Sequence, residues 1–287
     1  MTFSKDAQGG GRIQRRSGGG GLAIGAGGGI GGLLLVGLFL LLGGNPEDLN
    51  QGQTQAQNDG PAETVECDLN SANSDPECRM DYTANSLDQV WGELLPAQAN
   101  IEYTQPGIVS FTNSVQTGCG TASSATGPFY CPSDQTGYFD VSFFDQLAQL
   151  GGSDAPLAQE YIVAHEVGHH IQNLEGTLGL SNYNDPGEDS AAVALETQAD
   201  CYAGIWANRA AAAGTLEPIT DEQLASAIET ARAVGDDNIQ QRSGGQVNPD
   251  TWTHGSSEDR QRAFMSGYQS GNMSSCDFLQ RGNYRDA

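Results

Sequence analysis

Three histidines and a glutamate lie within six consecutive residues of this chain, where segment 165–170 reads HEVGHH. On an α-helix, residues four apart lie on the same face, so the imidazoles of His165 and His169 could bind one metal ion together. Glu166 would lie about 100° around the helix, where its carboxylate could reach a water molecule activated by that metal. The spacing therefore predicts two ligands and the base of a hydrolytic zinc site.

A zinc site of this kind needs a third protein ligand and one position that is left for water. The segment 194–200, ALETQAD, places Glu196 and Asp200 four residues apart, again on one face of a helix. We expect Glu196 to be the third ligand and Asp200 to accept a hydrogen bond from the far nitrogen of a ligating histidine. Two alternatives stay open: Asp200 could be the ligand instead of Glu196, or both acids could simply face water.

A third ligand from the first helix itself is disfavoured. The pattern HExxHxxGxxH would require glycine at position 172 and histidine at position 175. The chain has Gln172 and Glu175 at these positions. Without the glycine the helix should continue and carry Glu175 away from the histidines.

The fourth histidine of the chain lies near the C-terminus, in segment 252–260, which reads WTHGSSEDR. If this segment enters the site, His254 and Arg260 could donate hydrogen bonds to the oxyanion that forms during hydrolysis. The alternative is an ordinary helix cap and a surface ion pair, because no spacing within one helix ties this segment to the other histidines.

Four segments of the chain, in the order GPFYCPSDQTGYFD, HEVGHHIQ, ETQADCYAGIW and THGSSEDR, resemble the bacterial neutral zinc metallopeptidase family. The resemblance covers nearly the whole chain. The succession HExxH, ExxxD and TH-x5-R is also similar, more distantly, to membrane-bound peptidases of the CAAX-processing and heat-shock type. These relatives cross the membrane several times, so the resemblance does not imply cleavage within a membrane.

By position, the family resemblance implies one zinc ion per chain and a peptide or protein substrate. It implies Glu166 as the catalytic base and His254 and Arg260 as residues that stabilise the transition state. The implied zinc ligands are His165, His169 and Glu196. The alternative is a binding or assembly module, anchored in the cell envelope, whose zinc is structural and which catalyses nothing.

The elements that must position these residues follow from apolar periodicity and turn signals. The helices that we expect are 87–95, 143–150, 156–174, 191–213, 221–234 and 258–268. An extended segment at 103–113 and a hairpin formed by 129–131 and 138–141 predict a small antiparallel sheet beside the cleft. We therefore expect an α+β, zincin-like fold that is mainly helical, in a peptidase domain comprising residues 63–287.

Charge narrows the range of partners. The 287 residues contain 36 acidic and 12 basic side chains, and the net charge is −24. So negative a protein is a poor ligand for nucleic acid, whose phosphates it repels. Residues 1–42 hold four basic residues against one acidic residue, and Lys5 is the only lysine of the chain. We interpret the acidic remainder as a solvated surface.

An uncharged stretch, residues 22–42, reads LAIGAGGGIGGLLLVGLFLLL. As a helix it would be about 31 Å long, enough to cross a bilayer, so we expect a transmembrane helix that anchors the protein. A cleaved signal peptide is the alternative, although no A-x-A-like site is obvious. The positive-inside rule then makes residues 1–21 a cytoplasmic stub and 63–287 an extracytoplasmic domain of a single-pass protein of the cell membrane. Residues 43–62, polar and rich in Gly and Gln, would be a flexible linker.

All six cysteines follow that apolar stretch, which agrees with an oxidising compartment. An even count predicts three disulfides, and short loops are the easiest to close. The favoured pairs are Cys67 with Cys78, Cys119 with Cys131, and Cys201 with Cys276. A structural zinc site is the alternative, but the chain contains no C-x-x-C pair.

Overall fold

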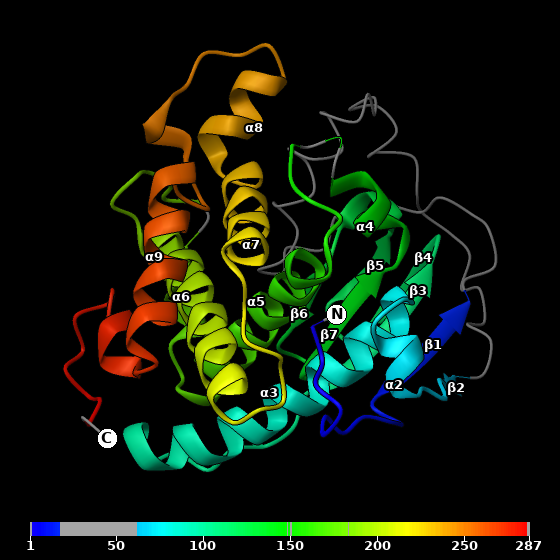
Figure 1. The fold of residues 1–287 in the computed structure, drawn as a ribbon. Helices are drawn as coiled ribbons and strands as arrows, with labels where there is room; N and C mark the ends of the chain where they lie inside the picture. The colour runs from blue at the N-terminus through cyan, green and yellow to red at the C-terminus, as the bar shows by residue number, and fades with distance from the viewer. Residues whose placement is uncertain (1, 18–61, 148, 150, 183, 286–287) are drawn as a thin grey trace.

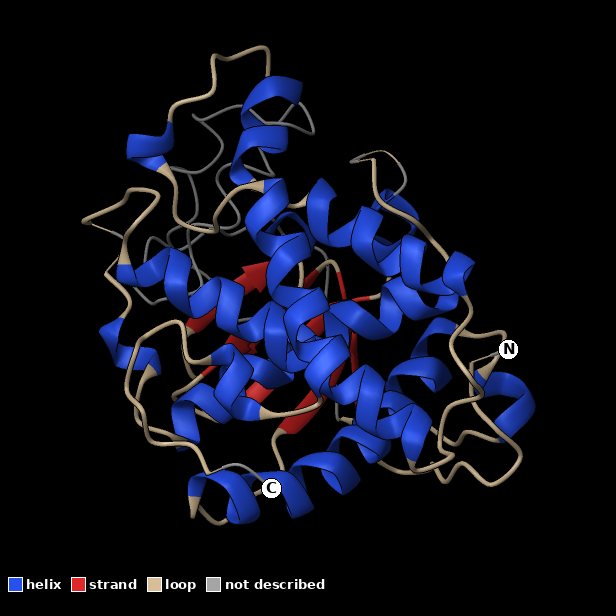
Figure 2. Cartoon of the chain, turned by 60° about the vertical axis from the view of Figure 1, so that its left-hand side comes forward, coloured by secondary structure: helices blue, strands red, loops and turns tan. Residues whose placement is uncertain are grey.

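The computed structural model describes residues 2–17, 62–147, 149, 151–182 and 184–285. Helices are the predominant regular structure of the described chain, and the strands lie together (Figures 1 and 2). Helix α5 (Pro156–Leu174) lies between the sheet and the C-terminal helices (Figure 1). The expected helix-rich α+β class is therefore confirmed. The other helices are α2 (Leu69–Ala72), α3 (Pro76–Ala99), α4 (Ser142–Leu147), α6 (Ala191–Ala212), α7 (Asp221–Ala233), α8 (Asp236–Arg242) and α9 (Ser257–Ser270).

The long helices begin at the signals that the sequence contains. Helix α5 has Pro156 in its first turn, where the missing N–H group costs no hydrogen bond. The Thr220 side chain accepts from the N–H group of Gln223 and completes a capping box on α7. Helix α9 begins one residue earlier than expected, because Ser256 rather than Ser257 caps it. The helices expected at 156–174, 191–213, 221–234 and 258–268 are thus confirmed to within two residues.

Helix α3 is much longer than the helix expected at 87–95. It begins at Pro76, and the carboxylate of Asp75 accepts a hydrogen bond from the N–H group of Cys78 at 3.0 Å. The first turns of α3 bury polar side chains, among them Arg79 and Asp81. Buried polar residues interrupt the apolar stripe by which an amphipathic helix is recognised, so the periodicity found only its second half.

The main sheet has five strands in the order β2 (Glu63–Thr64), β1 (Ile13–Ser17), β3 (Gly107–Thr112), β7 (Thr136–Asp140) and β6 (Phe129–Cys131). The predicted hairpin is present, since β6 and β7 pair antiparallel. The expectation of an antiparallel sheet is nevertheless wrong, because β1 and β7 both run parallel to β3. Long connections allow that direction, whereas a tight hairpin does not. Strands β4 (Ser114–Thr117) and β5 (Gly120–Ser123) form a separate ribbon.

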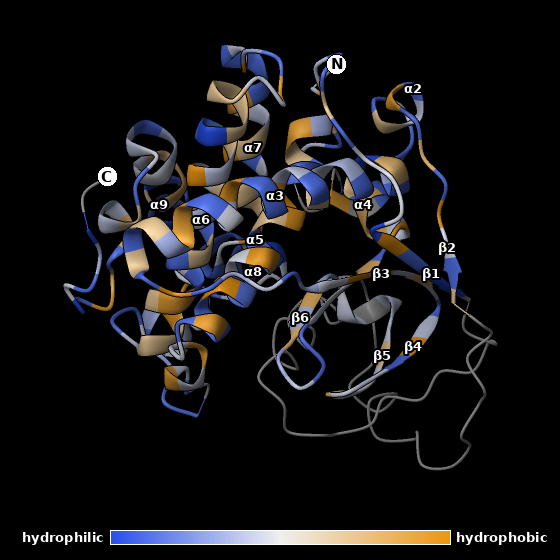
Figure 3. Ribbon diagram, turned by 90° about the horizontal axis from the view of Figure 1, so that it is seen from below, coloured by the Kyte–Doolittle hydropathy of each residue, from blue (hydrophilic) through white to orange (hydrophobic). Residues whose placement is uncertain are grey.

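The N-terminal residues 2–17 belong to the same folded unit as the rest of the described chain. Strand β1 lies between β2 and β3, and its residue Ile13 is fully buried. Figure 3 shows β1 beside β3, with which it pairs. The buried carboxylate of Asp81 on α3 accepts hydrogen bonds from the N–H groups of Arg12 at 2.7 Å and Ile13 at 3.2 Å. The predicted separate stub, residues 1–21, and the domain boundary at residue 63 do not agree with this packing.

This packing also bears on the expected orientation of the protein in the membrane. Because β1 pairs with both β2 and β3, the residues on either side of 18–61 lie on the same side of any membrane. A cytoplasmic N-terminus with the remaining domain outside does not fit that pairing. Within the described residues, no helix is both long and apolar enough to cross a bilayer. The predicted span 22–42 lies outside the described residues, as does all of the predicted linker except residue 62.

A substitution in β1 tests whether the N-terminus is part of the domain. Ile13 has no exposed surface, so Ile13→Ala is expected to lower the free energy of unfolding by about 2–5 kcal/mol. The control is Gln14→Ala, because the Gln14 side chain bonds Thr64 at the surface and its loss should change stability by less than about 0.5 kcal/mol. Urea unfolding of the two variants and the parent measures both effects. Equal stability of all three proteins would mean that β1 does not pack in solution.

The three disulfides agree with the predicted pairing. They join Cys67 to Cys78, Cys119 to Cys131, and Cys201 to Cys276. The third bond ties α6 to the short helix η5 (Met273–Cys276). Because no cysteine of the described chain is free, the alternative of a cysteine-ligated zinc site is not supported.

A buried carboxylate on α5 makes the stability depend on pH. Glu160 is fully buried, and its Oε1 atom lies 4.0 Å from Nε of Arg79. Burial raises the pKa of Glu160 to about 7, although the Arg79 charge opposes the shift. The folded chain therefore keeps this proton over a pH range in which the unfolded chain loses it.

The sign of this effect is testable with Glu160→Gln. Between the usual pKa of glutamate, about 4.5, and the folded pKa of about 7, the folded state binds more protons than the unfolded state. Stability from this group is therefore present at low pH and falls as the pH rises, by about 3 kcal/mol in total. Relative to Glu160→Gln, the parent should lose stability between pH 5 and pH 8 in urea titrations. A constant difference between the two proteins over that range would contradict the assignment.

Candidate metal centre

Close packing of α5 on α6 brings the predicted ligands together. A Cβ atom on Gly168 would lie 3.0 Å from Cα and 3.1 Å from the carbonyl oxygen of Ala199. Glycine on one helix and alanine on the other therefore let the two backbones approach closely. This contact places Glu196 opposite His165 and His169.

The three side chains form a compact group of ligand atoms. Nε2 of His165 lies 3.3 Å from Oε2 of Glu196, and Nε2 of His169 lies 3.7 Å from Oε1 of the same carboxylate. One donor atom from each of the three residues lies within 4.8 Å of the others, and all three residues are buried. Atoms that bind one zinc ion at about 2 Å each lie roughly 3–4 Å apart. The group therefore fits a single metal ion of this size.

Both histidines are oriented through Nδ1, the ring nitrogen that does not face the metal position. Nδ1 of His165 lies 2.8 Å from Oδ1 of Asp200, and Nδ1 of His169 lies 2.8 Å from Oε1 of Gln172. An Nδ1–H donor on each ring leaves the Nε2 lone pair directed at the metal position. The structure thus places Asp200 beside the far nitrogen, as the sequence predicts, and not among the three grouped ligand atoms.

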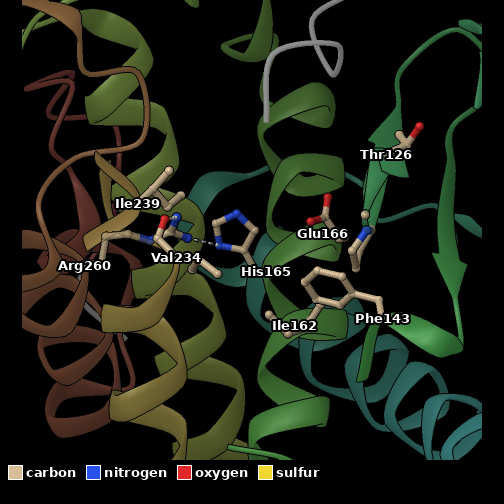
Figure 4. Close-up of a pocket in the computed structure, with 10 residues that line it drawn as sticks. Thr126, Phe143, Ile162, His165, Glu166, Val234, Ile239 and Arg260 are labelled. Atoms are coloured by element: carbon tan, nitrogen blue, oxygen red, sulfur yellow. Dashed lines mark hydrogen bonds between the residues drawn. The ribbon is translucent and has the colours of Figure 1, made fainter. Parts of the chain in front are cut away.

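Asp200 is itself held by a buried arginine and a tyrosine. Arg260 donates from Nε to Oδ2 of Asp200 at 2.8 Å and from Nη2 to Oδ1 at 2.9 Å. Its Nη1 atom donates to the carbonyl oxygen of Val234, and the Tyr161 hydroxyl donates to Oδ1 of Asp200. Arg260 is 2% exposed. Through these hydrogen bonds Arg260 holds Asp200 and supports the His165 ring (Figure 4). The sequence instead predicted that Arg260 contacts an oxyanion.

The electrostatics of the centre favour a positive charge at the metal position. Burial alone would raise the pKa of Glu196, but the charge of His169 and the hydrogen bond from His165 outweigh it and hold that pKa well below its usual range. Burial likewise opposes charge on His165, but Asp200 and Glu196 raise its pKa to about 10. The same carboxylates would stabilise a metal cation between the rings.

Glu166 lies on the same helix but outside the ligand group. With His165 it lines a pocket at the surface of α5, where its carboxylate faces the open space (Figure 4). Burial raises the pKa of Glu166, and the charges of His165 and His169 offset part of the shift. No hydrogen bond from the described residues occupies this carboxylate. A base whose pKa is shifted toward neutrality and whose oxygens are free can accept a proton from water.

His254 reaches the centre on a loop that Asp236 fixes. The Asp236 carboxylate accepts hydrogen bonds from the N–H groups of Thr253 at 2.8 Å, His254 at 2.7 Å and Gly255 at 3.1 Å. It also lies 3.1 Å from Nδ1 of His254. Gly255 has φ +89°, and a Cβ atom there would lie 3.1 Å from Cγ1 of Val193 on α6. The loop therefore packs directly against the helix that carries Glu196.

One of the two ring nitrogens of His254 is available for a further hydrogen bond. His254 is buried, and its Nε2 atom has no hydrogen-bond partner among the described residues. A positive charge on this ring would help to lower the pKa of Glu196, so His254 lies within electrostatic reach of that ligand. A buried polar atom without a partner is costly unless another molecule satisfies it. The sequence-predicted residue thus lies beside the centre with an unused donor or acceptor.

Comparison with known proteins agrees with this geometry. The family described as "Putative neutral zinc metallopeptidase" matches residues 3–279. The chain belongs to this family. It is 49% identical over 214 residues to an uncharacterized protein of Mycobacterium tuberculosis strain H37Rv, which covers 72% of this chain and 71% of that protein. It is 35% identical over 280 residues to the uncharacterized protein YpfJ of Escherichia coli K12, covering 92% and 93%. No solved structure matches the chain.

Two residues that support this candidate metal centre, Gln172 and Asp236, are not predicted as such by the sequence. Gln172 orients His169 and donates from Nε2 to the carbonyl oxygen of Leu195 at 2.6 Å. It also bonds Oε1 of Gln198 at 3.1 Å. Gln172 follows His169 by three residues, a helical spacing that could have identified it. Asp236 has no such local signal, because its partner lies in a separate loop.

Proposed function

We propose that this protein is a zinc-dependent peptidase that hydrolyses internal bonds of peptides or proteins. The observation that carries the proposal is the arrangement around α5. Two oriented histidines and Glu196 are grouped as metal ligands, while Glu166 lies on the same helix but faces a pocket. A structural metal site closes around its ion, whereas a catalytic site pairs three ligands with an accessible base. The family and its implied zinc support the same function.

The roles of the residues follow from their positions. His165, His169 and Glu196 would hold the zinc ion, which when bound supplies Lewis acidity that lowers the pKa of water towards about 7 and polarises a carbonyl group. Glu166 takes a proton from the attacking water and passes it to the nitrogen of the departing amine. With Nδ1 directed at Asp236, His254 would donate from Nε2 to the oxyanion when both ring nitrogens carry a proton, which supplies the partner that this atom lacks in the described chain. Arg260 acts through Asp200 and keeps the His165 ring in place.

We also propose an oxidising compartment outside the cytoplasm. Three disulfides in one domain are typical of such compartments and rare in the cytosol. If residues 22–42 hold the protein at a membrane, the pairing of β1 with β2 and β3 requires the chain on both sides of residues 18–61 to face that compartment. The proposal thus keeps the predicted compartment of the catalytic domain but moves the N-terminal residues into it.

The test combines metal analysis with cleavage of a mixed peptide library. It uses the full chain, because a fragment that starts at residue 63 would lack β1. Purified protein should contain about one zinc ion per chain and cleave peptides. A chelator should abolish the cleavage, and added zinc should restore it. Bound zinc without hydrolysis of any peptide would favour the non-catalytic binding or assembly module, and protein that binds no zinc would contradict both functions.

A further inference from the structure

A pocket opens directly beside the proposed base. Its floor is α5, where Ile162 lies one turn before Glu166. One wall comes from the loop before β6 and from Phe143 on α4. The opposite wall comes from Val234, just after α7, and Ile239 on α8 (Figure 4). The pocket therefore lies between the sheet and the C-terminal helices, next to the position where a scissile bond would be held.

The lining of this pocket is apolar, and its charged groups have other roles. Phe143 and Ile162 are buried, and Val234 and Ile239 are partly exposed at its rim. Arg260 also contributes to the wall, but Asp200 neutralises its guanidinium. Glu166 would repel an acidic group. His165, the other basic residue of the lining, is a proposed metal ligand, so no described cation is left in this pocket to bind an acidic side chain. A lysine side chain would lose its hydration against the apolar walls.

We propose that this pocket binds an apolar side chain of the substrate, such as that of leucine, at a residue adjacent to the cleaved bond. The inference rests on the proposed peptidase function and adds a substrate class to it. An apolar side chain gains by leaving water for such walls, whereas a charged one is penalised. The pocket would thus set which bond of a peptide is placed between Glu166 and the metal ligands.

Peptide binding tests the pocket separately from catalysis. The probes are the blocked pentapeptides acetyl-Ala-Ala-X-Ala-Ala-amide, in which X is leucine, aspartate or lysine, titrated calorimetrically into the zinc-loaded full chain carrying Glu166→Gln. The leucine peptide should bind about ten to a hundred times more tightly than the aspartate peptide. Equal affinities, or tighter binding of either charged peptide, would overturn the proposal. A leucine preference in a protein that cleaves nothing would support the pocket while contradicting the peptidase function.

Charge substitutions at the rim test whether these residues make the preference. Ile239 is partly exposed, so a polar side chain is tolerable there. In the same background Ile239→Asp should shift the preference toward the lysine peptide, and Ile239→Lys should shift it toward the aspartate peptide, each by about tenfold. The matched control is Leu180→Asp. Leu180 is also apolar, but it is 53% exposed and lies outside the pocket. Preferences that change equally in Leu180→Asp, or in none of the variants, would show that another surface selects the peptide.

Discussion

Glu166→Gln is expected to abolish peptide hydrolysis and to leave zinc bound. Glutamine keeps the shape of the side chain but cannot accept the proton of the attacking water. Because a positioned general base contributes roughly a hundredfold to ten-thousandfold in rate, kcat should fall by at least that range. Zinc content should stay near one ion per chain, since Glu166 lies outside the group formed by His165, His169 and Glu196. Steady-state kinetics and metal analysis of the same preparation measure both quantities.

A second glutamate at the end of the same helix provides the matched control. The Glu175 carboxylate accepts hydrogen bonds from the hydroxyl groups of Tyr202 at 2.9 Å and Tyr284 at 2.8 Å, away from the pocket. Glu175→Gln makes the same chemical change and keeps an acceptor oxygen, so kcat should stay close to that of the parent. If Glu166→Gln cleaved peptides as fast as the parent, Glu166 would not be the base. If it lost its zinc, Glu166 would be a ligand.

The metal centre could be predicted from the sequence because its main residues repeat at helical spacing. His165 with His169, and Glu196 with Asp200, are each four residues apart, so each pair shares a helix face whatever the rest of the chain does. The structure only had to bring the two helices together, and Gly168 with Ala199 allows that approach. The spacing of these residues within each helix thus determines most of the geometry of the metal centre.

The role of Arg260 could not be predicted in the same way. Because Arg260 follows His254 closely in the sequence, both side chains were expected to enter the cleft. Residues that are close in sequence can nevertheless lie at different depths in one site. Arg260 lies on α9 and reaches Asp200 on α6, sixty residues earlier in the chain. Such a contact depends on how α9 packs on α6, where Gly267 brings the two backbones into direct contact. No short-range pattern encodes that packing.

The N-terminal strand escaped prediction for a related reason. Residues 13–17 contain one large apolar residue, Ile13, among polar ones, and the apolar stretch that follows dominates any hydropathy reading. Parallel pairing of β1 with β3 joins residues 95 positions apart, such as Ile13 and Ile108. Asp81 reinforces that pairing by accepting backbone hydrogen bonds from β1 and the residues before it, although the helix that carries Asp81 was itself only half predicted. Long-range contacts of this kind are specified by the whole fold.

Asp200→Asn is expected to have the largest effect on stability and to weaken metal binding as well. Asp200 is fully buried, and the substitution leaves the Arg260 guanidinium buried without its carboxylate. Loss of one partner of a buried ion pair costs about 3–5 kcal/mol, so the free energy of unfolding of the metal-free protein should fall by that amount. His165 also loses the anion that orients its ring, which should lower zinc affinity by about ten- to a hundredfold. Urea unfolding and competition with a chromogenic chelator measure the two effects.

The double variant Asp200→Asn with Arg260→Met separates these two effects. Methionine removes the stranded charge and keeps much of the volume, so the double variant should recover a large part of the stability that Asp200→Asn loses. Zinc affinity should stay low in it, because the anion behind His165 is still missing. Recovery of both quantities would mean that Asp200 matters only as the partner of Arg260. Recovery of neither would mean that the ion pair is not what Asp200 contributes to the fold. Stability that returns without zinc affinity is the result expected if one carboxylate both neutralises Arg260 and orients a metal ligand.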